Sequence, residues 1–265
     1  MLGCLRYYFT LLRRIELLLC RPVAERLFNY FSLFFYNKNG LIAYILYLCS
    51  MKGEANILEV SRMTVSYGSR TVINDFSMFL NRGEMVAVTG ASGSGKSSLL
   101  RAILGFVLMD SGEVNIDGTV VGGGHYDVLR QRTSYLPQDL SFPCEFVSEV
   151  LELPFTFKCN RHRGVSHEMW DDYLLRLGLD KGIKDMRVNE ISGGQRQRLM
   201  LAVTAMLDKD IILLDEPTSA LDSRSAELVI DFLQELVRNG KSVLAVTHDA
   251  KFAAACDRIV EIPTL

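Results

Sequence analysis

A glycine-rich loop follows the apolar run Met85–Thr89 and reads Gly90, Ala91, Ser92, Gly93, Ser94, Gly95, Lys96, Ser97 and Ser98. Its glycines allow successive backbone N–H groups to turn into one hollow, and a helix that starts near Lys96 adds the positive end of its dipole. Lys96 is placed to reach the β- and γ-phosphates of a nucleotide, and the Ser97 hydroxyl is placed to bind Mg²⁺. The order of strand, loop and helix therefore predicts that this loop binds a nucleoside triphosphate.

Two adjacent carboxylates follow a second apolar run, Ile211–Leu214. Asp215 closes the run and is predicted to hold Mg²⁺ through the water around the ion, and Glu216 beside it can polarise an attacking water. An Asp-Glu-Pro sequence is also an ordinary way for a chain to leave a strand, so the pair alone does not define a catalytic site. Together with the phosphate loop, it predicts hydrolysis of the bound triphosphate.

A second helix start that suits anions consists of Ser192, Gly193, Gly194 and Gln195. Ser192 is the expected N-cap, and the paired glycines expose backbone N–H groups. One chain rarely needs two such helix starts for one triphosphate. We therefore expect this segment to close over a nucleotide that a second copy of the chain holds.

Three apolar runs rich in β-branched residues are expected to form parallel strands that are buried on both faces, namely residues 85–89, 211–214 and 243–247. They end at the phosphate loop, at the carboxylate pair and at His248. Because ligands of open α/β sheets bind at the carboxyl ends of the strands, these three groups are predicted to meet at one site.

The remaining patterns surround this sheet. Residues 57–61, 71–81 and 113–121 alternate apolar and polar side chains and predict a small antiparallel sheet. Residues 139–207 have mostly helical periodicity and predict a helical subdomain, and Ser223–Arg238 carries an apolar face that predicts a covering helix. The predicted fold class is α/β, with a mostly parallel core sheet, a flanking antiparallel β-subdomain and a helical subdomain.

The composition limits the classes of partner. Of 265 residues, 29 are Lys or Arg and 31 are Asp or Glu, which gives a formal net charge of −2. Such a balance offers no general attraction for nucleic acid, so we expect no nucleic-acid partner. The six cysteines are widely spaced, without a Cys-x-x-Cys pair, and are interpreted as reduced thiols of a cytosolic protein.

Residues 1–50 differ from the rest because Leu, Tyr, Phe, Ile and Arg dominate them. We predict a boundary near Met51, with a hydrophobic N-terminal extension at 1–50 and the nucleotide-binding domain at 51–265. The apolar stretches of the extension are each too short to cross a bilayer, and Asn37–Gly40 interrupts them. Three interpretations stay open: a poorly defined membrane-spanning helix, a membrane-surface or targeting segment, or a wrongly assigned start with translation beginning at Met51.

The motifs occur in an order that resembles the nucleotide-binding subunit of ABC transporters. The resemblance rests on the phosphate loop, on Ser-Gly-Gly-Gln at 192–195 and on Leu-Leu-Asp-Glu-Pro-Thr-Ser-Ala-Leu-Asp at 213–222, and it runs from about residue 57 to residue 262. It implies the P-loop NTPase fold of the ABC type, with ATP and Mg²⁺ as ligands and ATP hydrolysis as the activity.

The resemblance also implies roles for residues that have none by themselves. Tyr67 is expected to stack on the adenine, and because stacking tolerates other bases, GTP is also an allowed ligand. Gln138 is expected to touch Mg²⁺ or water. His248 is expected to contact the γ-phosphate. The interface loop, which we define as Ser219, Ala220, Leu221 and Asp222, is similar to the loop that crosses the dimer interface. The predicted catalytic residues are thus Gln138, Glu216 and His248, and the predicted metal-binding residues are Ser97, Gln138 and Asp215.

The implied function is that of an ATP-hydrolysing subunit that powers transport. Two copies, forming a homodimer, would sandwich two ATP molecules, each between the phosphate loop of one copy and the Ser192–Gln195 segment of the other. No stretch from Met51 onward is a membrane span, so we expect separate integral membrane permease subunits, with this chain peripheral at the cytoplasmic face of the inner membrane. A narrower resemblance, through Arg130–Tyr135 and Leu153–Phe155, is to the FetA/YbbL type of small bacterial ABC ATPases.

Two alternatives stay open. The apolar residues after Gln138 offer a docking surface for a permease helix or belong to the core of the helical subdomain, namely Phe142, Pro143, Phe146, Val150, Leu153, Pro154 and Phe155. The competing function is a soluble ABC ATPase that acts on DNA or ribosomes. Those relatives usually carry long coiled coils, zinc motifs or two tandem ATPase halves, and the sequence shows none of these.

Overall fold

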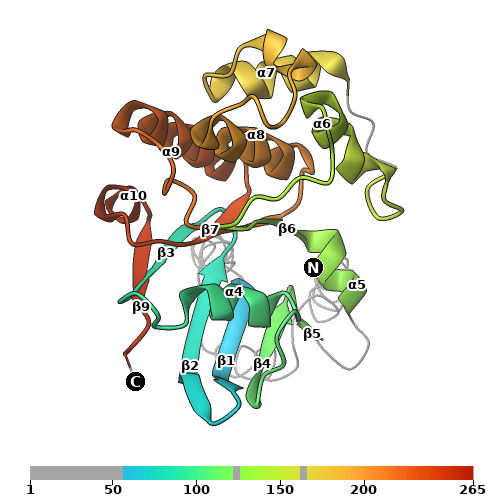
Figure 1. Ribbon diagram of the computed structural model, residues 1–265. Helices are drawn as coiled ribbons and strands as arrows, with labels where there is room; N and C mark the ends of the chain where they lie inside the picture. Colours follow the sequence, from blue (N-terminus) through green and yellow to red (C-terminus); the bar gives the residue numbers. More distant parts are fainter. Residues whose placement is uncertain (1–55, 122–125, 162–165, 265) are drawn as a thin grey trace, which may run out of the picture. The chain divides into compact units, whose positions relative to one another are not determined.

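A computed structural model describes residues 56–121, 126–161 and 166–264 (Figure 1). The predicted extension at 1–50 and the boundary near Met51 lie outside the described residues. Within them, two sheets and a set of helices form the predicted α/β architecture.

The central sheet has five strands in the order β6-β7-β8-β3-β9, and all neighbouring pairs are parallel. Strands β3 (Met85–Thr89), β7 (Ile211–Asp215) and β8 (Ser242–Val246) agree with the sequence prediction to within one residue at each end. The two edge strands, β6 (Thr133–Leu136) and β9 (Arg258–Glu261), were not predicted from the sequence.

The two faces of this sheet pack into different cores, as strand alternation requires. Ile212 and Leu214 of β7 belong to a core shared with the helices α8 (Gly193–Met206) and α9 (Ser223–Arg238). Ile211 and Leu213 belong to a core shared with helix α4 (Lys96–Ile103) and the second sheet. Helices α4 and α8 therefore cover opposite faces of the parallel sheet (Figure 1).

The second sheet is antiparallel, with the order β2-β1-β4-β5. Its strands are β1 (Asn56–Tyr67), β2 (Arg70–Asn81), β4 (Ser111–Ile116) and β5 (Thr119–Val121). Strand β1 is longer than the sequence predicted because it continues past several register shifts in its pairing with β2.

The remaining helices are α5 (Tyr126–Arg132), α6 (Val147–Thr156), α7 (His167–Arg176), the 3₁₀ helix η1 (Lys181–Asp185) and α10 (Ala250–Ala254). Helices α6, α7 and α8 group on one side of the parallel sheet (Figure 1). Helix α9 buries Val229, Phe232, Leu233 and Leu236, four positions of its predicted apolar face. Across residues 56–121, 126–161 and 166–264, no helix is long and apolar enough to cross a membrane.

Candidate nucleotide site

The phosphate loop between β3 and α4 is shaped by its glycines. Gly95 has φ +95°, and a Cβ atom there would lie 2.7 Å from the Val72 carbonyl oxygen, so only glycine fits. At Gly90, a Cβ would lie 2.7 Å from Ser94 Oγ and 3.1 Å from the Ile262 carbonyl oxygen, so a side chain there would require these neighbours to shift. Ser94 Oγ is buried and has no hydrogen-bond partner in the described part of the chain. A loop this tightly wound, with an unsatisfied buried hydroxyl, fits a polar ligand in its hollow.

Lys96 begins α4 and folds back over this loop. Its Nζ donates hydrogen bonds to the carbonyl oxygens of Gly90 at 2.9 Å and Ala91 at 3.0 Å. The N-cap residue, Gly95, makes no side-chain capping bond, so the first N–H groups of α4 have no side-chain oxygen from the cap. The ammonium and these N–H groups thus converge on one hollow suited to phosphate oxygens.

Ser97 and Asp215 meet at the carboxyl end of β7. Ser97 Oγ donates to Asp215 Oδ1 at 3.0 Å, and the Tyr135 hydroxyl donates to Asp215 Oδ2 at 3.5 Å. Burial raises the pKa of Asp215 and also raises that of Tyr135, to about 12. A hydroxyl and a buried carboxylate side by side are oxygen donors of the kind that Mg²⁺ prefers. Tyr135 was missed by the sequence analysis, because β6 was not predicted there.

Glu216 and His248 also lie together, although they are 32 positions apart in the chain. His248 Nδ1 lies 2.8 Å from Glu216 Oε2, and the His248 backbone N–H donates to the same oxygen at 3.3 Å. Glu216 is held in the left-handed region at φ 53°, where its N–H donates to the Val246 carbonyl. The carboxylate is nearly buried, whereas the His248 side chain is 70% exposed and can reach an incoming group.

Tyr67 and Gln138 border the site at two other strand ends. Tyr67 is the last residue of β1 and is 47% exposed, with its hydroxyl 3.3 Å from Ser98 Oγ on α4. Gln138 is exposed and stands two residues after β6, whose last residue, Leu136, pairs with Leu214 just before Asp215. Both side chains are therefore free to meet a ligand at the edge that carries the phosphate loop.

We expect Tyr67→Ala to weaken nucleotide binding by about 5- to 150-fold, because stacking of a base on an aromatic ring is worth ~1–3 kcal/mol. Tyr67→Phe keeps the ring and loses only the contact with Ser98, so it should bind with parental affinity. Titration with a slowly hydrolysed ATP analogue measures both dissociation constants. Parental affinity in Tyr67→Ala would exclude a stacking role.

The Ser192–Gln195 segment forms the predicted helix start. Ser192 Oγ accepts from the Gln195 N–H at 3.2 Å, and Gln195 Oε1 accepts from the Ser192 N–H at 2.8 Å, which makes a reciprocal capping box. The helix that it opens, α8, covers the face of the sheet opposite α4.

The interface loop leaves β7 and leads into α9. Asp222 caps α9 by accepting the Ser225 N–H at 2.7 Å. The loop also touches α8, because the Gln197 side chain accepts the Ala220 N–H at 3.0 Å and donates to the Glu216 carbonyl at 2.7 Å. Gln197 was not among the predicted residues; it stands among the polar residues Gln195, Arg196 and Arg198, so its type and position gave no signal in the sequence.

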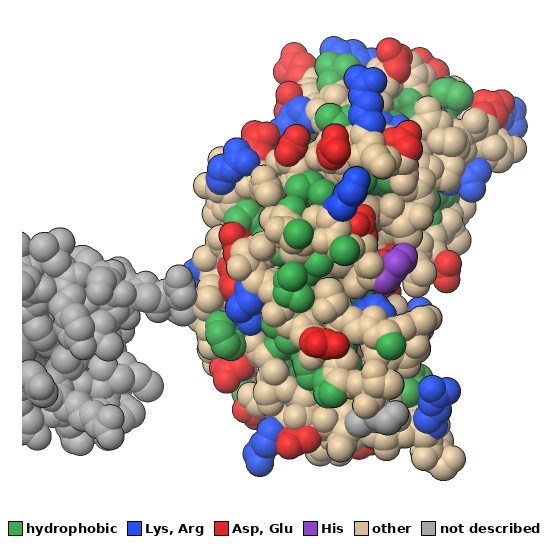
Figure 2. Space-filling view, turned by 90° about the vertical axis from the view of Figure 1, so that its left-hand side faces the viewer, with side chains coloured by type: hydrophobic (Ala, Val, Ile, Leu, Met, Phe, Trp, Pro, Cys, Tyr) green, Lys and Arg blue, Asp and Glu red, His purple; other side chains and the backbone are tan. Residues whose placement is uncertain are grey.

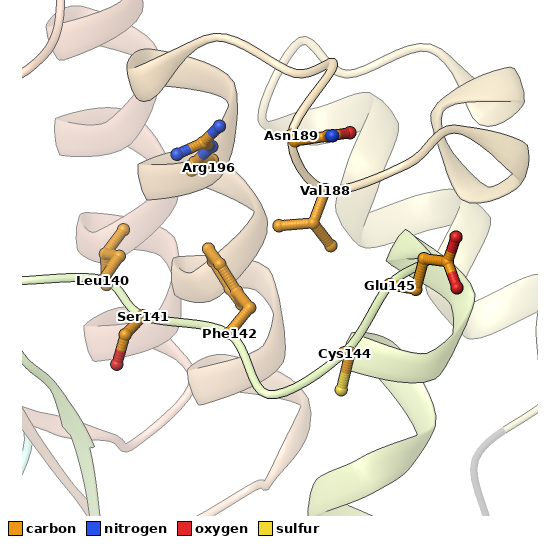
Figure 3. A pocket seen from close by; sticks show the side chains of 8 residues that line it. All are labelled: Leu140, Ser141, Phe142, Cys144, Glu145, Val188, Asn189 and Arg196. Atoms are coloured by element: carbon orange, nitrogen blue, oxygen red, sulfur yellow. The ribbon is translucent and has the colours of Figure 1, made fainter.

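A cavity of about 370 Å³ lies apart from these groups, beside the first turns of α8. Figure 3 shows its walls: the loop between β6 and α6, the segment before α8, and α8 itself. Apolar side chains mix with Glu145 and Arg196 at its edges; the lining residues are Leu140, Ser141, Phe142, Cys144, Glu145, Val188, Asn189 and Arg196. Of the residues predicted to dock a permease helix, Phe142 lines this cavity and also packs against the core that the helices share with the sheet, and Val150 is buried in that core.

Known proteins are similar to this chain in sequence and in fold. Residues 73–219 match the family model described as "ABC transporter". The chain is 40% identical to the macrolide export ATP-binding/permease protein MacB of Shewanella sp. (strain ANA-3), over 78% of this chain and 32% of that protein. It is 32% identical to a probable metal transport system ATP-binding protein of Chlamydia trachomatis, over 72% of this chain and 74% of that protein.

A solved structure has the same fold over nearly its whole length. The ATP-binding cassette MJ0796, described as a dimer in a post-hydrolysis state bound to ADP and Pi, aligns with a TM-score of 0.71 and 28% identity, covering 78% of this chain and 94% of that one. The chain belongs to the ABC transporter family. It spans about a third of the length of the export proteins that it matches.

Proposed function

We propose that the chain binds and hydrolyses ATP to power an ABC transporter through integral membrane permease subunits. The observation that carries this proposal is the gathering of three groups at the carboxyl ends of parallel strands: the phosphate loop with Lys96, the Ser97–Asp215 pair and the Glu216–His248 pair. These are the parts that phosphoryl transfer to water requires.

The proposed chemistry assigns each group one task. The loop N–H groups and Lys96 bind the β- and γ-phosphates, and Tyr67 supports the base. Ser97, Asp215 and Gln138 would hold Mg²⁺, which neutralises charge on the phosphates when bound. Glu216 accepts a proton from the attacking water, and His248 holds the Glu216 carboxylate in place while it contacts the γ-phosphate.

The position of the Ser192–Gln195 segment supports a dimer that shares its sites. Helix α8, which this segment opens, covers the face of the sheet opposite α4, and we infer that the segment serves the nucleotide of a second copy. Two copies would then hold two ATP molecules between them, with the interface loop crossing at the contact. The solved cassette MJ0796, described as a dimer, is consistent with this arrangement.

We infer that a permease partner docks at the cavity beside α8, which would hold this chain at the cytoplasmic face of the inner membrane. A short amphipathic helix fits a groove of apolar residues with charges at its edges. Two relatives are named ATP-binding/permease proteins, and this chain matches about a third of each. Their names indicate proteins that contain both an ATP-binding part and a permease part. Because relatives are named for macrolide export and for metal transport, we assign the choice of cargo to the permease, and the narrower resemblance to the FetA/YbbL type stays a prediction.

Copurification tests this proposal. The chain is tagged at its C-terminus, native membranes are solubilised in mild detergent, and the proteins that copurify are identified by mass spectrometry. A stoichiometric partner with several membrane spans is the expected result. Recovery with ribosomal or DNA-associated proteins alone would contradict it.

We expect Phe142→Asp to release the permease partner, because a carboxylate would enter the apolar part of the cavity. The control is Ile259→Asp, which places the same charge on the exposed β9 at the other edge of the sheet. Quantitative copurification should show loss of the partner for the first variant alone, with ATP binding unchanged in both. Full recovery of the partner with Phe142→Asp would exclude this cavity as the docking site.

No observation favours action on DNA or ribosomes. Acidic and basic side chains are interspersed over the face shown in Figure 2, and neither sign gathers into a continuous patch there. The formal net charge of −2 points the same way.

A further inference from the structure

Gln197 stands on α8 just after the Ser192–Gln195 segment, and its side-chain amide lies between three parts of the chain. Only 5% of the residue is exposed. Its Nε2 donates to the Glu216 carbonyl oxygen at 2.7 Å, and its Oε1 accepts from the Ala220 N–H at 3.0 Å. One buried amide thus links helix α8 to Glu216 and to the interface loop.

Further contacts bring the same elements together. A Cβ atom at Gly194 would lie 3.1 Å from the Ala220 carbonyl oxygen and 3.3 Å from Leu221 Cδ2, so the backbone of α8 approaches the interface loop closely. The Glu216 carbonyl also accepts from Ser219 Oγ at 3.1 Å. Glu216 has the left-handed conformation that non-glycine residues seldom adopt, and these hydrogen bonds to its carbonyl help to hold it there, together with the bond from its N–H to Val246.

We propose that Gln197 is a positioning residue that couples the two nucleotide sites of the dimer. The inference rests on the proposed function, in which Ser192–Gln195 and the interface loop serve the nucleotide of the second copy, whereas Glu216 serves the nucleotide of its own copy. Gln197 then joins the segments that contact one nucleotide to the residue that acts on the other. Closure around one ATP orients Glu216 at the second site.

The chemistry of the amide makes this role testable. Glutamine supplies a donor to the Glu216 carbonyl and an acceptor to the Ala220 N–H. Methionine has a similar length but supplies no donor and only a weak acceptor. Glu at the same position keeps the acceptor and, when ionised, loses the donor. The matched control is Gln234→Met, because Gln234 also donates a side-chain hydrogen bond to a backbone carbonyl, that of Ala255 at 3.1 Å, and it stands on α9.

The experiment measures the rate of ATP hydrolysis against ATP concentration for the full-length chain, together with thermal unfolding. For Gln197→Met we expect kcat to fall at least about tenfold, since small misplacements of catalytic groups cost up to ~100-fold, and the Hill coefficient to fall from above 1 to about 1. Binding of an ATP analogue to the single chain should not change, and Gln234→Met should keep the parental kcat and Hill coefficient. If Gln197→Met does not fold, Gln197→Glu carries the same expectation.

Three results would overturn the proposal: parental kcat and Hill coefficient in a folded Gln197→Met chain, an equal loss in Gln234→Met, or a parental Hill coefficient of 1. The proposed function fails separately, through the Glu216→Gln chain. If that chain stays monomeric with saturating ATP, the shared-site dimer is wrong. If it dimerises while Gln197→Met behaves as the parent, only the role of Gln197 is wrong.

Discussion

Glu216→Gln is expected to lower the rate of ATP hydrolysis by at least about 100-fold while ATP binding is retained, since loss of a general base costs ~100- to 10,000-fold. The substitution keeps the shape of the side chain and the backbone bonds that hold it, including the contact from the Gln197 amide. It removes the carboxylate that would accept the proton of water. Steady-state phosphate release and equilibrium nucleotide binding measure the two quantities.

The control for this variant is Glu227→Gln, which makes the same chemical change on the exposed face of α9. It should hydrolyse ATP at the parental rate. Hydrolysis at the parental rate by Glu216→Gln would remove Glu216 as the base. Loss of binding together with hydrolysis would instead assign Glu216 a structural role.

The second large effect is expected for Lys96→Ala, which should weaken ATP binding by at least about 30-fold, because removing one partner of a buried charge pair costs ~2–5 kcal/mol. Lys96 is 9% exposed and bonds to the Gly90 and Ala91 carbonyls, so its ammonium stands inside the loop that would receive the phosphates. Hydrolysis should become undetectable at ATP concentrations that saturate the parent.

Lys251→Ala is the matched control, since Lys251 is exposed on α10. A thermal unfolding curve for each variant separates loss of the ligand site from loss of the fold, because Lys96 also makes the two bonds within the loop. A folded Lys96→Ala chain that binds ATP as the parent does would contradict the assignment of the phosphate loop.

The parts of the fold that the sequence predicted are those with strong local patterns. Strands β3, β7 and β8 are continuous apolar runs because both of their faces are buried, and the apolar face of α9 repeats at helical spacing. The two edge strands have no such pattern. Strand β6 is four residues long and contains two buried polar side chains, and the burial of side chains along β9 alternates only weakly. The strand conformation of these two segments therefore depends on pairing with β7 and β3.

The same distinction holds for the site. The residues of the phosphate loop follow one another in the chain, and so do the two carboxylates. The prediction of each group could therefore rest on residue type and spacing. Tyr135 and Gln197 contribute through contacts between residues far apart in sequence, with Asp215 and with Ala220. Neither carries a local signal, and only the tertiary structure brings them to the site.

The central claim is that two copies share two ATP molecules, and the mass of the Glu216→Gln chain in solution tests it most directly. Light scattering after size-exclusion chromatography, with and without Mg²⁺ and ATP, measures that mass, and nucleotide extraction from the peak counts the bound ATP. The account predicts a monomer without ATP and, with ATP, a dimer that carries one ATP per chain and that a second substitution, Ser192→Arg, abolishes. A chain that binds ATP and stays monomeric at saturation would contradict it.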